Sequence, residues 1–160
     1  MINHRKEHLY QLTLQWTGNT GEGTTNYRAY DRTYQVEASG KPVIFGSSDP
    51  AFRGDATKYN PEELLVAAIS SCHLLWYLHL CANAGVVVIN YSDSPMGKMS
   101  ETQNGGGRFT EVILKPKVTI TAKSSLEQAT ELHHKAHEFC FIANSVNFPI
   151  HCQSSIKIIH

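Results

Sequence analysis

Two cysteines far apart in the sequence have the surroundings expected of reacting thiols. Cys72 lies in a long apolar segment, where Ser70, Ser71 and His73 are its polar neighbours, and Cys140 ends a second helical segment. A thiolate attacks a peroxide, and a nearby second thiol condenses with the sulfenic acid that forms. The pair therefore fits a two-cysteine peroxidase, while an inert buried cysteine is the alternative for each thiol alone. Spacing along the chain does not show whether the two sulfurs meet.

The other two cysteines are expected to be structural. Cys81 lies nine residues after Cys72, and nine helical steps of about 100° place it on the opposite side of a helix. Cys152 stands near the last strand, with no polar cluster in the adjacent sequence. Four cysteines are also too few for the disulfide framework of a small secreted domain.

A histidine-rich segment supports a rival function. His133, His137 and Cys140 are spaced so that a helix presents all three on one face, which suits zinc. His73, His79 or Cys72 would complete such a site. The spacing matches no common zinc signature, and histidines on an exposed helix face are usually solvated.

Composition excludes several classes of protein. The 14 basic and 14 acidic residues give zero formal net charge, which disfavours nucleic-acid and anionic membrane partners. Residues 1–7 lack the apolar stretch of a signal peptide, and the longest apolar segment, 64–88, is interrupted by polar residues and glycine. We expect one cytoplasmic domain over residues 1–160, with no cofactor and no bound metal.

The elements that must position these residues form an α+β pattern. Apolar alternation and turn residues predict strands at 8–17, 24–38, 43–45, 86–91, 97–102, 109–122 and 154–159. Asn60 and Pro61 favour the start of a helix that runs to Ala84 and is stopped by Gly85, and a second helix is expected over 126–141. The triple glycine 105–107 is expected at a hairpin tip. The first helix is apolar nearly all round, which predicts a central helix covered on most sides.

Two motifs resemble those of a known family. The run 60–65, Asn-Pro-Glu-Glu-Leu-Leu, is followed by 67–73, Ala-Ala-Ile-Ser-Ser-Cys-His, and the later run 140–145 is Cys-Phe-Ile-Ala-Asn-Ser. These runs, with Trp-Thr-Gly-Asn at 16–19, resemble the OsmC/Ohr family of osmotically inducible proteins C and organic hydroperoxide resistance proteins. The resemblance extends over nearly the whole chain and is more specific than either cysteine alone.

The resemblance implies a function and roles for named residues. Cys72 would be the peroxidatic cysteine, Cys140 the resolving one, and Glu62 the carboxylate that orients an arginine beside the thiolate. Organic hydroperoxides would be the oxidants and a dithiol such as dihydrolipoamide the reductant. The first hairpin loop, which holds the arginine in many relatives, has none here, so Arg53 is the preferred substitute and Arg28 the second. A scaffold that has lost catalysis and only binds a ligand therefore stays open as an alternative.

The position of Glu62 also bears on assembly. Ten helical residues separate it from Cys72, which is about 15 Å along a straight helix and too far for one carboxylate. Either a bend or a loop brings Glu62 back, or a second subunit's helix crosses the first and supplies its own Glu62. We expect the second arrangement, an intertwined homodimer of antiparallel sheets packed around the long helix and the second helix. The resemblance implies the same assembly. Trp76, Phe139 and Phe141 are candidates for an apolar substrate pocket, with ordinary core packing as the alternative.

Overall fold

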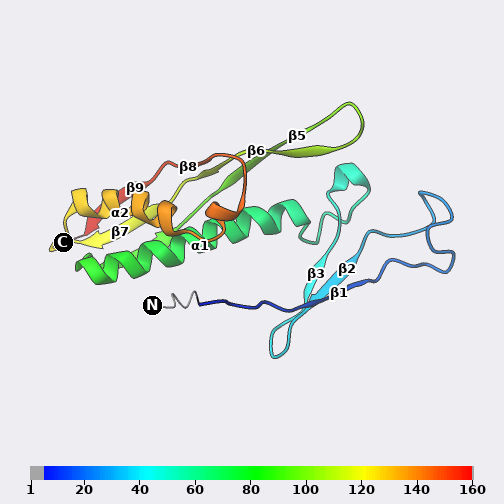
Figure 1. Cartoon of the computed structure of the whole chain (residues 1–160), viewed down its shortest axis with the longest axis horizontal. Coiled ribbons are helices and arrows are strands. Elements are labelled where there is room, and N and C mark those ends of the chain that lie inside the picture. Colours follow the sequence, from blue (N-terminus) through cyan, green and yellow to red (C-terminus); the bar gives the residue numbers. More distant parts are fainter. Residues whose placement is uncertain (1–5, 160) are drawn as a thin grey trace, which may run out of the picture. The chain divides into compact units, whose positions relative to one another are not determined.

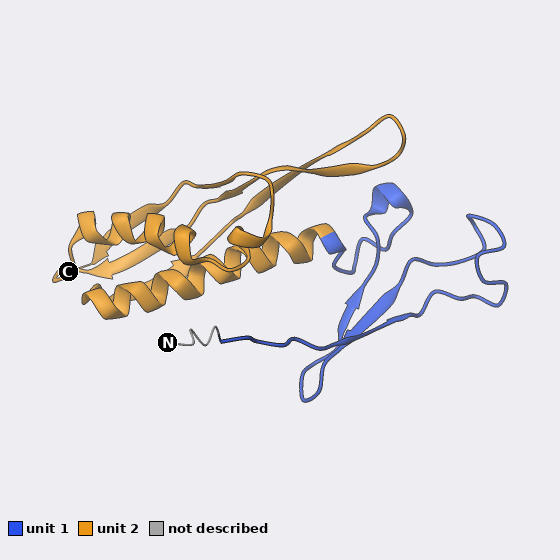
Figure 2. Ribbon diagram, viewed as in Figure 1, with its two compact units in different colours: residues 1–61 blue, residues 62–160 orange. Residues whose placement is uncertain are grey.

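The computed structural model describes residues 6–159 and divides into two compact units, residues 1–61 and 62–160 (Figure 2). Most of the amino-terminal segment 1–7, examined above for a signal peptide, lies outside the described residues.

The first unit is built on a three-stranded antiparallel sheet (Figure 1). Its strands are β1 (Thr13–Trp16), β2 (Tyr34–Glu37) and β3 (Ile44–Gly46), and a short 3-10 helix, η1 (Pro50–Phe52), follows them. The predicted amino-terminal hairpin and the third strand are confirmed, because β1 pairs with β2 and β2 with β3.

The strand predicted over 24–38 is wrong in its first part, and the strand predicted over 8–17 is shorter than expected. The backbone before β2 forms turns, apart from an isolated bridge between Asn19 and Tyr30. Asn19 Oδ1 accepts from the backbone N–H groups of Gly21 and Gly23, and Arg32 donates to the carbonyl oxygens of Tyr27 and Tyr30. Local side-chain hydrogen bonds of this kind compete with strand pairing.

The second unit begins with the long helix α1 (Pro61–Ala84), as predicted. The helix ends where Gly85 takes a φ of 74°, a left-handed conformation that glycine adopts without a steric penalty. The second helix, α2 (Leu126–Phe139), also lies where the sequence predicts it, although it ends two residues early. Its first turn is capped by the Ser125 hydroxyl, which accepts from the backbone N–H of Gln128 at 3.2 Å.

Two three-stranded sheets accompany these helices. One has the order β4-β7-β9 and the other β5-β6-β8. The strands are β4 (Val88–Ser92), β5 (Met96–Glu101), β6 (Gly107–Leu114), β7 (Lys117–Thr121), β8 (Ile150–Cys152) and β9 (Ser155–Ile159). The hairpin at the triple glycine is confirmed, since β5 pairs antiparallel with β6 across it.

The single strand predicted over 109–122 is wrong, because the chain leaves one sheet and enters the other at Lys115-Pro116. Proline has no N–H to continue a ladder, so a change of sheet there loses no hydrogen bond. The alternation itself was read correctly: Val112, Leu114, Val118 and Ile120 are all buried. The sequence reading missed β8, which pairs in parallel with β6, as β9 does with β7.

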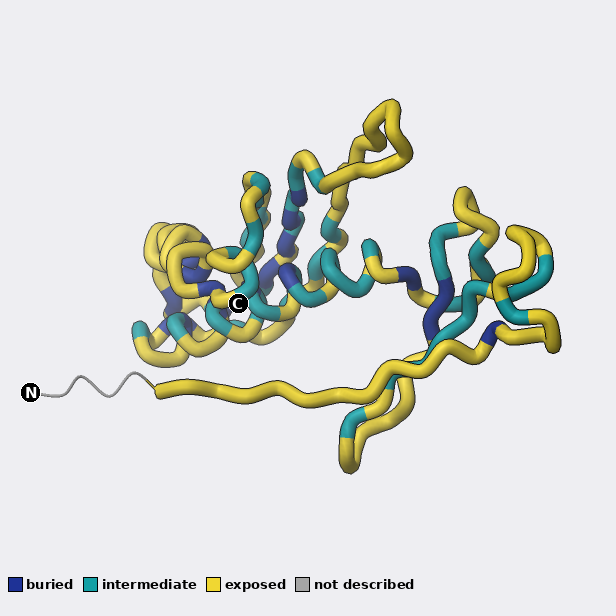
Figure 3. Tube along the Cα trace, turned by 45° about the vertical axis from the view of Figure 1, so that its right-hand side comes forward, coloured by how far each residue is buried: buried dark blue, intermediate teal, exposed yellow. Residues whose placement is uncertain are grey.

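Helix α1 is buried along one stripe only. Ile69, His73, Tyr77 and Cys81 follow one another at four-residue intervals and are its buried residues. Leu75 is 65% exposed, and exposed positions alternate with half-buried ones along the rest of the helix (Figure 3). The helix is long and apolar enough to cross a membrane by length and composition, a test that the core helix of a water-soluble protein also passes. The expected α+β class with two helices is confirmed.

Candidate functional site

The fold brings the two predicted reactive cysteines together. Cys72 is half-buried in the middle of α1, and Cys140 is the residue that caps the end of α2. Their side chains hydrogen-bond to each other, and both are free thiols. The backbone N–H of Ala143 also donates to Cys140 Sγ at 3.4 Å. The two thiols are therefore in side-chain contact although they lie 68 positions apart in the sequence.

The two thiols have different surroundings. Cys140 is only 1% exposed, and burial raises its pKa to about 11, with the hydrogen bond to Cys72 and the charge of Cys72 acting in the same direction. A thiol kept protonated in this way is a hydrogen-bond donor toward its neighbour. Cys72 is therefore the more accessible sulfur of the pair.

An aromatic cluster flanks the cysteine pair. The Trp76 ring lies one helical turn after Cys72, stacks on Phe139 with centroids 5.3 Å apart, and meets Phe141 edge-on at 5.5 Å. Phe139 and Phe141 are 49% and 65% exposed, so the aromatic cluster lies at the surface and does not belong to the hydrophobic core. A shallow depression of about 210 Å³ adjoins it, lined by Leu75, Trp76 and His79. The three residues expected to surround the thiol, Trp76, Phe139 and Phe141, thus contact one another, and their role in a substrate pocket stays a prediction.

Glu62 lies in the first turn of α1, and the helix is continuous from there past Cys72. The ten intervening residues correspond to about 15 Å along the axis. A single α1 therefore does not bring this carboxylate to the thiol of its own chain, as the sequence indicated.

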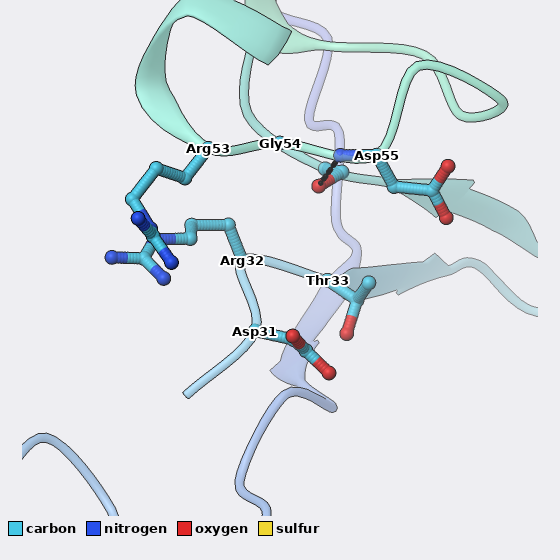
Figure 4. Close-up of a pocket in the computed structure, with 7 residues that line it drawn as sticks. Asp31, Arg32, Thr33, Arg53, Gly54 and Asp55 are labelled. Atoms are coloured by element: carbon cyan, nitrogen blue, oxygen red, sulfur yellow. Dashed lines mark hydrogen bonds between the residues drawn. The ribbon is translucent and has the colours of Figure 1, made fainter. Parts of the chain in front are cut away.

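Arg53 belongs to the first unit, where it lines a pocket of about 240 Å³ (Figure 4). It adopts a left-handed φ of 62°, the one such non-glycine residue among those described, and it ends η1. Its guanidinium lies 5.8 Å from the centre of the Tyr27 ring, and that of Arg32 lies 4.4 Å from the same ring. The other residues of the pocket are Asp31, Arg32, Thr33, Ser47, Gly54 and Asp55.

Arg32 is the pocket residue that sequence reasoning missed, since nothing in its local sequence distinguishes it from a surface arginine. Figure 4 shows its side chain extending toward that of Arg53. Asp55 is paired with Lys58, which holds the pKa of that carboxyl well below its usual range. Arg28 was expected on a strand but lies in a turn, with its backbone N–H bonded to Asn26.

The zinc site expected from the histidine-rich segment is wrong in its ligands. Among residues 6–159, His133, His137 and Cys140 do not form a group with metal-ligand spacing. Cys140 contacts Cys72 instead, and His133 is buried against His73 of α1. Cys152, expected to have no polar cluster nearby, lies 3.8 Å from His73 Nε2. The pairs of His73 with His133 and with Cys152 join two helices and a strand, so the spacing of residues within one segment of the sequence does not predict them.

Comparison with known proteins gives consistent results. The family model for OsmC-like proteins matches residues 54–155. An OsmC-like protein of unknown function from Vibrio cholerae is similar in structure, with a TM-score of 0.84 and 32% identity over 93% of this chain and 100% of that one. No curated protein matches the sequence.

Two more distant structures share the fold. An organic hydroperoxide resistance protein from Elizabethkingia anophelis has a TM-score of 0.66 and 20% identity, over 96% of this chain and 100% of that one. An organic hydroperoxide resistance protein from Legionella pneumophila has the same TM-score and 19% identity, over 94% of this chain and 99% of that one.

Proposed function

The chain belongs to the OsmC-like protein family, and on that basis we propose that it is a cytoplasmic thiol peroxidase that reduces organic hydroperoxides. In this proposal Cys72 attacks the peroxide and Cys140 resolves the product. The observation that supports it most directly is the hydrogen bond between the two thiols, which come from different helices. Two of the structures that share the fold are named organic hydroperoxide resistance proteins.

The proposed cycle has three balanced steps. The Cys72 thiolate attacks the terminal peroxide oxygen, an S–O bond forms, the O–O bond breaks, and the leaving alkoxide takes a proton to become the alcohol. The Cys140 thiol then attacks the sulfenic acid of Cys72, which forms the disulfide and releases water. A dithiol reductant such as dihydrolipoamide finally exchanges with the disulfide, which restores both thiols as the reductant itself becomes a disulfide.

The environment of Cys140 supports this division of roles. Its protonated thiol donates toward Cys72, and an anionic sulfur gains from such a donor. Because Cys140 is 1% exposed, a peroxide reaches the half-buried Cys72 first. The sulfur that attacks is thus exposed to substrate, and the sulfur that resolves is protected from it.

The aromatic cluster supports the proposal that the substrate is an organic hydroperoxide. Trp76, Phe139 and Phe141 offer apolar and partly exposed rings beside the cysteine pair, which suits the alkyl or aryl part of a hydroperoxide. Hydrogen peroxide has no such part and gains nothing from these rings.

Arg53 is the proposed guanidinium that favours the Cys72 thiolate, and Glu62 is the proposed carboxylate that orients it. A cation beside a thiol raises its thiolate fraction, and it also stabilises the alkoxide that leaves. The left-handed backbone of Arg53 is the kind of local strain that is often found at functional positions. Lysine keeps the positive charge of arginine but lacks the planar guanidinium with its fixed N–H donors. We therefore expect Arg53→Lys to lower kcat/KM more than Arg28→Lys does, because Arg53 is the proposed partner of the thiolate.

We also propose that the protein is a homodimer in which α1 is covered by the partner subunit. Leu75 and Leu78 of α1 are 65% and 37% exposed, and Phe141 is 65% exposed. Single chains rarely leave so apolar a helix uncovered. Light scattering coupled to size-exclusion chromatography tests this assembly: a mass near twice 17.8 kDa is expected, and a folded species at 17.8 kDa would contradict it.

The experiment for the whole proposal compares wild type, Cys72→Ser and Cys140→Ser in dithiol-dependent consumption of cumene hydroperoxide. We expect Cys72→Ser to abolish turnover, whereas Cys140→Ser reacts once and accumulates oxidised Cys72. Cys81→Ala, which removes a buried thiol outside the pair, serves as the matched control and should keep turnover. Equal activity of wild type and Cys72→Ser refutes the peroxidase mechanism, and no turnover by wild type favours the ligand-binding alternative.

A further inference from the structure

Three side chains from different elements of the second unit converge beside the core. His73 belongs to α1, His133 to α2 and Cys152 to β8 (Figure 1). His73 Nε2 lies 3.0 Å from His133 Nδ1, and Cys152 Sγ lies 3.8 Å from His73 Nε2. One ligand atom from each residue lies within 4.8 Å of the other two, the one such group of three among residues 6–159.

These separations match the edges of a metal tetrahedron. Zinc binds imidazole nitrogen at about 2.0–2.1 Å and thiolate sulfur at about 2.3 Å, which sets the tetrahedral edges at roughly 3.3 Å between nitrogens and roughly 3.6 Å between nitrogen and sulfur. The observed 3.0 Å and 3.8 Å differ from these edges by only a few tenths of an ångström. Two imidazoles and a thiolate are also the ligand types that zinc and its neighbours in the first transition row prefer.

The histidine pair is buried, and one of its rings is held in a fixed plane. His73 and His133 are 1% and 3% exposed, and Nε2 of His133 is buried without a hydrogen-bond partner. The Tyr77 ring stacks on the His133 ring at 3.9 Å, which fixes the plane of that imidazole.

The charge state of the cluster suits a cation. Burial lowers the pKa of His73 to about 4 and that of His133 to about 3, so both rings are neutral, the form that ligates metals. Burial raises the pKa of the third ligand, Cys152, to about 11, so its thiol is protonated until a metal displaces the proton. Asp93 acts electrostatically on both His73 and Cys152, which adds a negative charge near the cluster. Its carboxylate is held in place by Ser70 and by the backbone N–H of Lys115.

We propose that His73, His133 and Cys152 form a binding site for one divalent transition metal of the zinc type, separate from the Cys72 and Cys140 pair. Cys152 is exposed, so the fourth coordination position is open to solvent and a water molecule fills it. Binding breaks the hydrogen bond between the rings, and the shared proton moves to the other nitrogen of the same ring. The Cys152 thiol releases one proton to solvent, and no atom changes its oxidation state.

The site is distinct from the redox pair although Cys72 and His73 are adjacent in sequence. Successive residues of a helix point about 100° apart, so their side chains leave α1 on different sides. His73 points into the buried stripe of α1, and Cys72 does not belong to that stripe. A metal at His73 would join α1, α2 and β8, and it should stabilise the folded state in proportion to its binding.

Titration of the reduced protein with Co²⁺ tests the proposal, because thiolate ligation gives a charge-transfer absorption band in the near ultraviolet. We expect the band to saturate at one equivalent, to disappear in Cys152→Ser and to need at least tenfold more Co²⁺ in His133→Asn. His134→Asn, an exposed neighbour on α2, is the matched control and should behave like wild type. Zn²⁺ should displace Co²⁺ and raise Tm in wild type but not in Cys152→Ser.

Two results would overturn the metal site. One is a wild-type protein that shows no saturable band. The other is a band that survives in Cys152→Ser but is lost in Cys72→Ser, which would place the metal on the redox pair. Neither readout involves a peroxide, so the failure of this site and the failure of the peroxidase proposal are separate outcomes.

Discussion

The unequal burial of the two paired thiols predicts a large difference in their reactivity toward an alkylating reagent. At pH 7.5, a thiol with the pKa of about 11 held by Cys140 is ionised to only about 0.03%, whereas an unshifted thiol with a pKa of 9.0 is ionised to about 3%. Thiolates are the alkylated species, so ionisation alone slows Cys140 about 100-fold relative to such a thiol. Its 1% exposure slows it further.

The assay is timed treatment of the reduced protein with iodoacetamide at pH 7.5, followed by mass spectrometry of the peptides that carry each cysteine. We expect Cys72 to be labelled first and Cys140 to stay unlabelled until the protein unfolds. The Cys72→Ala variant removes the hydrogen bond and the charge that contribute to the raised pKa, so Cys140 should react faster there, although burial still protects it. Equal labelling rates of Cys72 and Cys140 in folded wild type would refute the assigned roles.

Four further outcomes follow from particular residues. Trp76→Ala removes the ring that contacts Phe139 and Phe141, so kcat/KM should fall about tenfold for cumene hydroperoxide and little for hydrogen peroxide, as measured by peroxide consumption. Gly85→Ala should lower the free energy of unfolding in urea by about 1 kcal/mol, because the left-handed φ of 74° disfavours any Cβ; an unchanged midpoint would contradict this. The folded state keeps the Cys140 proton that an unfolded thiol loses, so Cys140 should lower the free energy of unfolding by at most about 3 kcal/mol as pH rises from 9 toward 11. A Cys140→Ala variant should show a smaller decline than wild type, and it keeps some decline because burial also raises the pKa of Cys152 to about 11. The chain has two tryptophans, Trp16 in the first unit and Trp76 in the second, so Trp16→Phe and Trp76→Phe each leave one tryptophan that reports on one unit. The fluorescence of the two variants should give the same urea midpoint if the chain is one domain, whereas two different midpoints would indicate two domains.

The candidate site was predictable from sequence where its residues belong to strong local patterns. Cys72 stands out because polar residues interrupt an apolar helix there, and Cys140 stands out because it ends the next helix. The helix boundaries at Pro61 and Gly85 depend on backbone chemistry that acts within a few residues, so they were predicted correctly.

Strand pairing was less predictable. The residues before β2 have strand-forming side chains, but hydrogen bonds from Asn19 and Arg32 hold them in turns. The strand β8 is three residues long and is defined by parallel pairing with β6, a partner far away in sequence. Local propensity carries no information about such a partner, since packing and burial decide what a short segment does.

The sequence alone determined the extent of α1, the position of α2, the α+β class, the buried face of residues 112–120 and the choice of Cys72 and Cys140 as candidate thiols. Those features depend on periodicity, capping and side-chain chemistry within one segment. Only the tertiary structure decided that Cys140 contacts Cys72 and that His133 lies against His73 with Cys152 beside it. Contacts between helices and strands depend on how whole faces pack, and the free energy that selects one packing is spread over many buried side chains rather than written in any one motif.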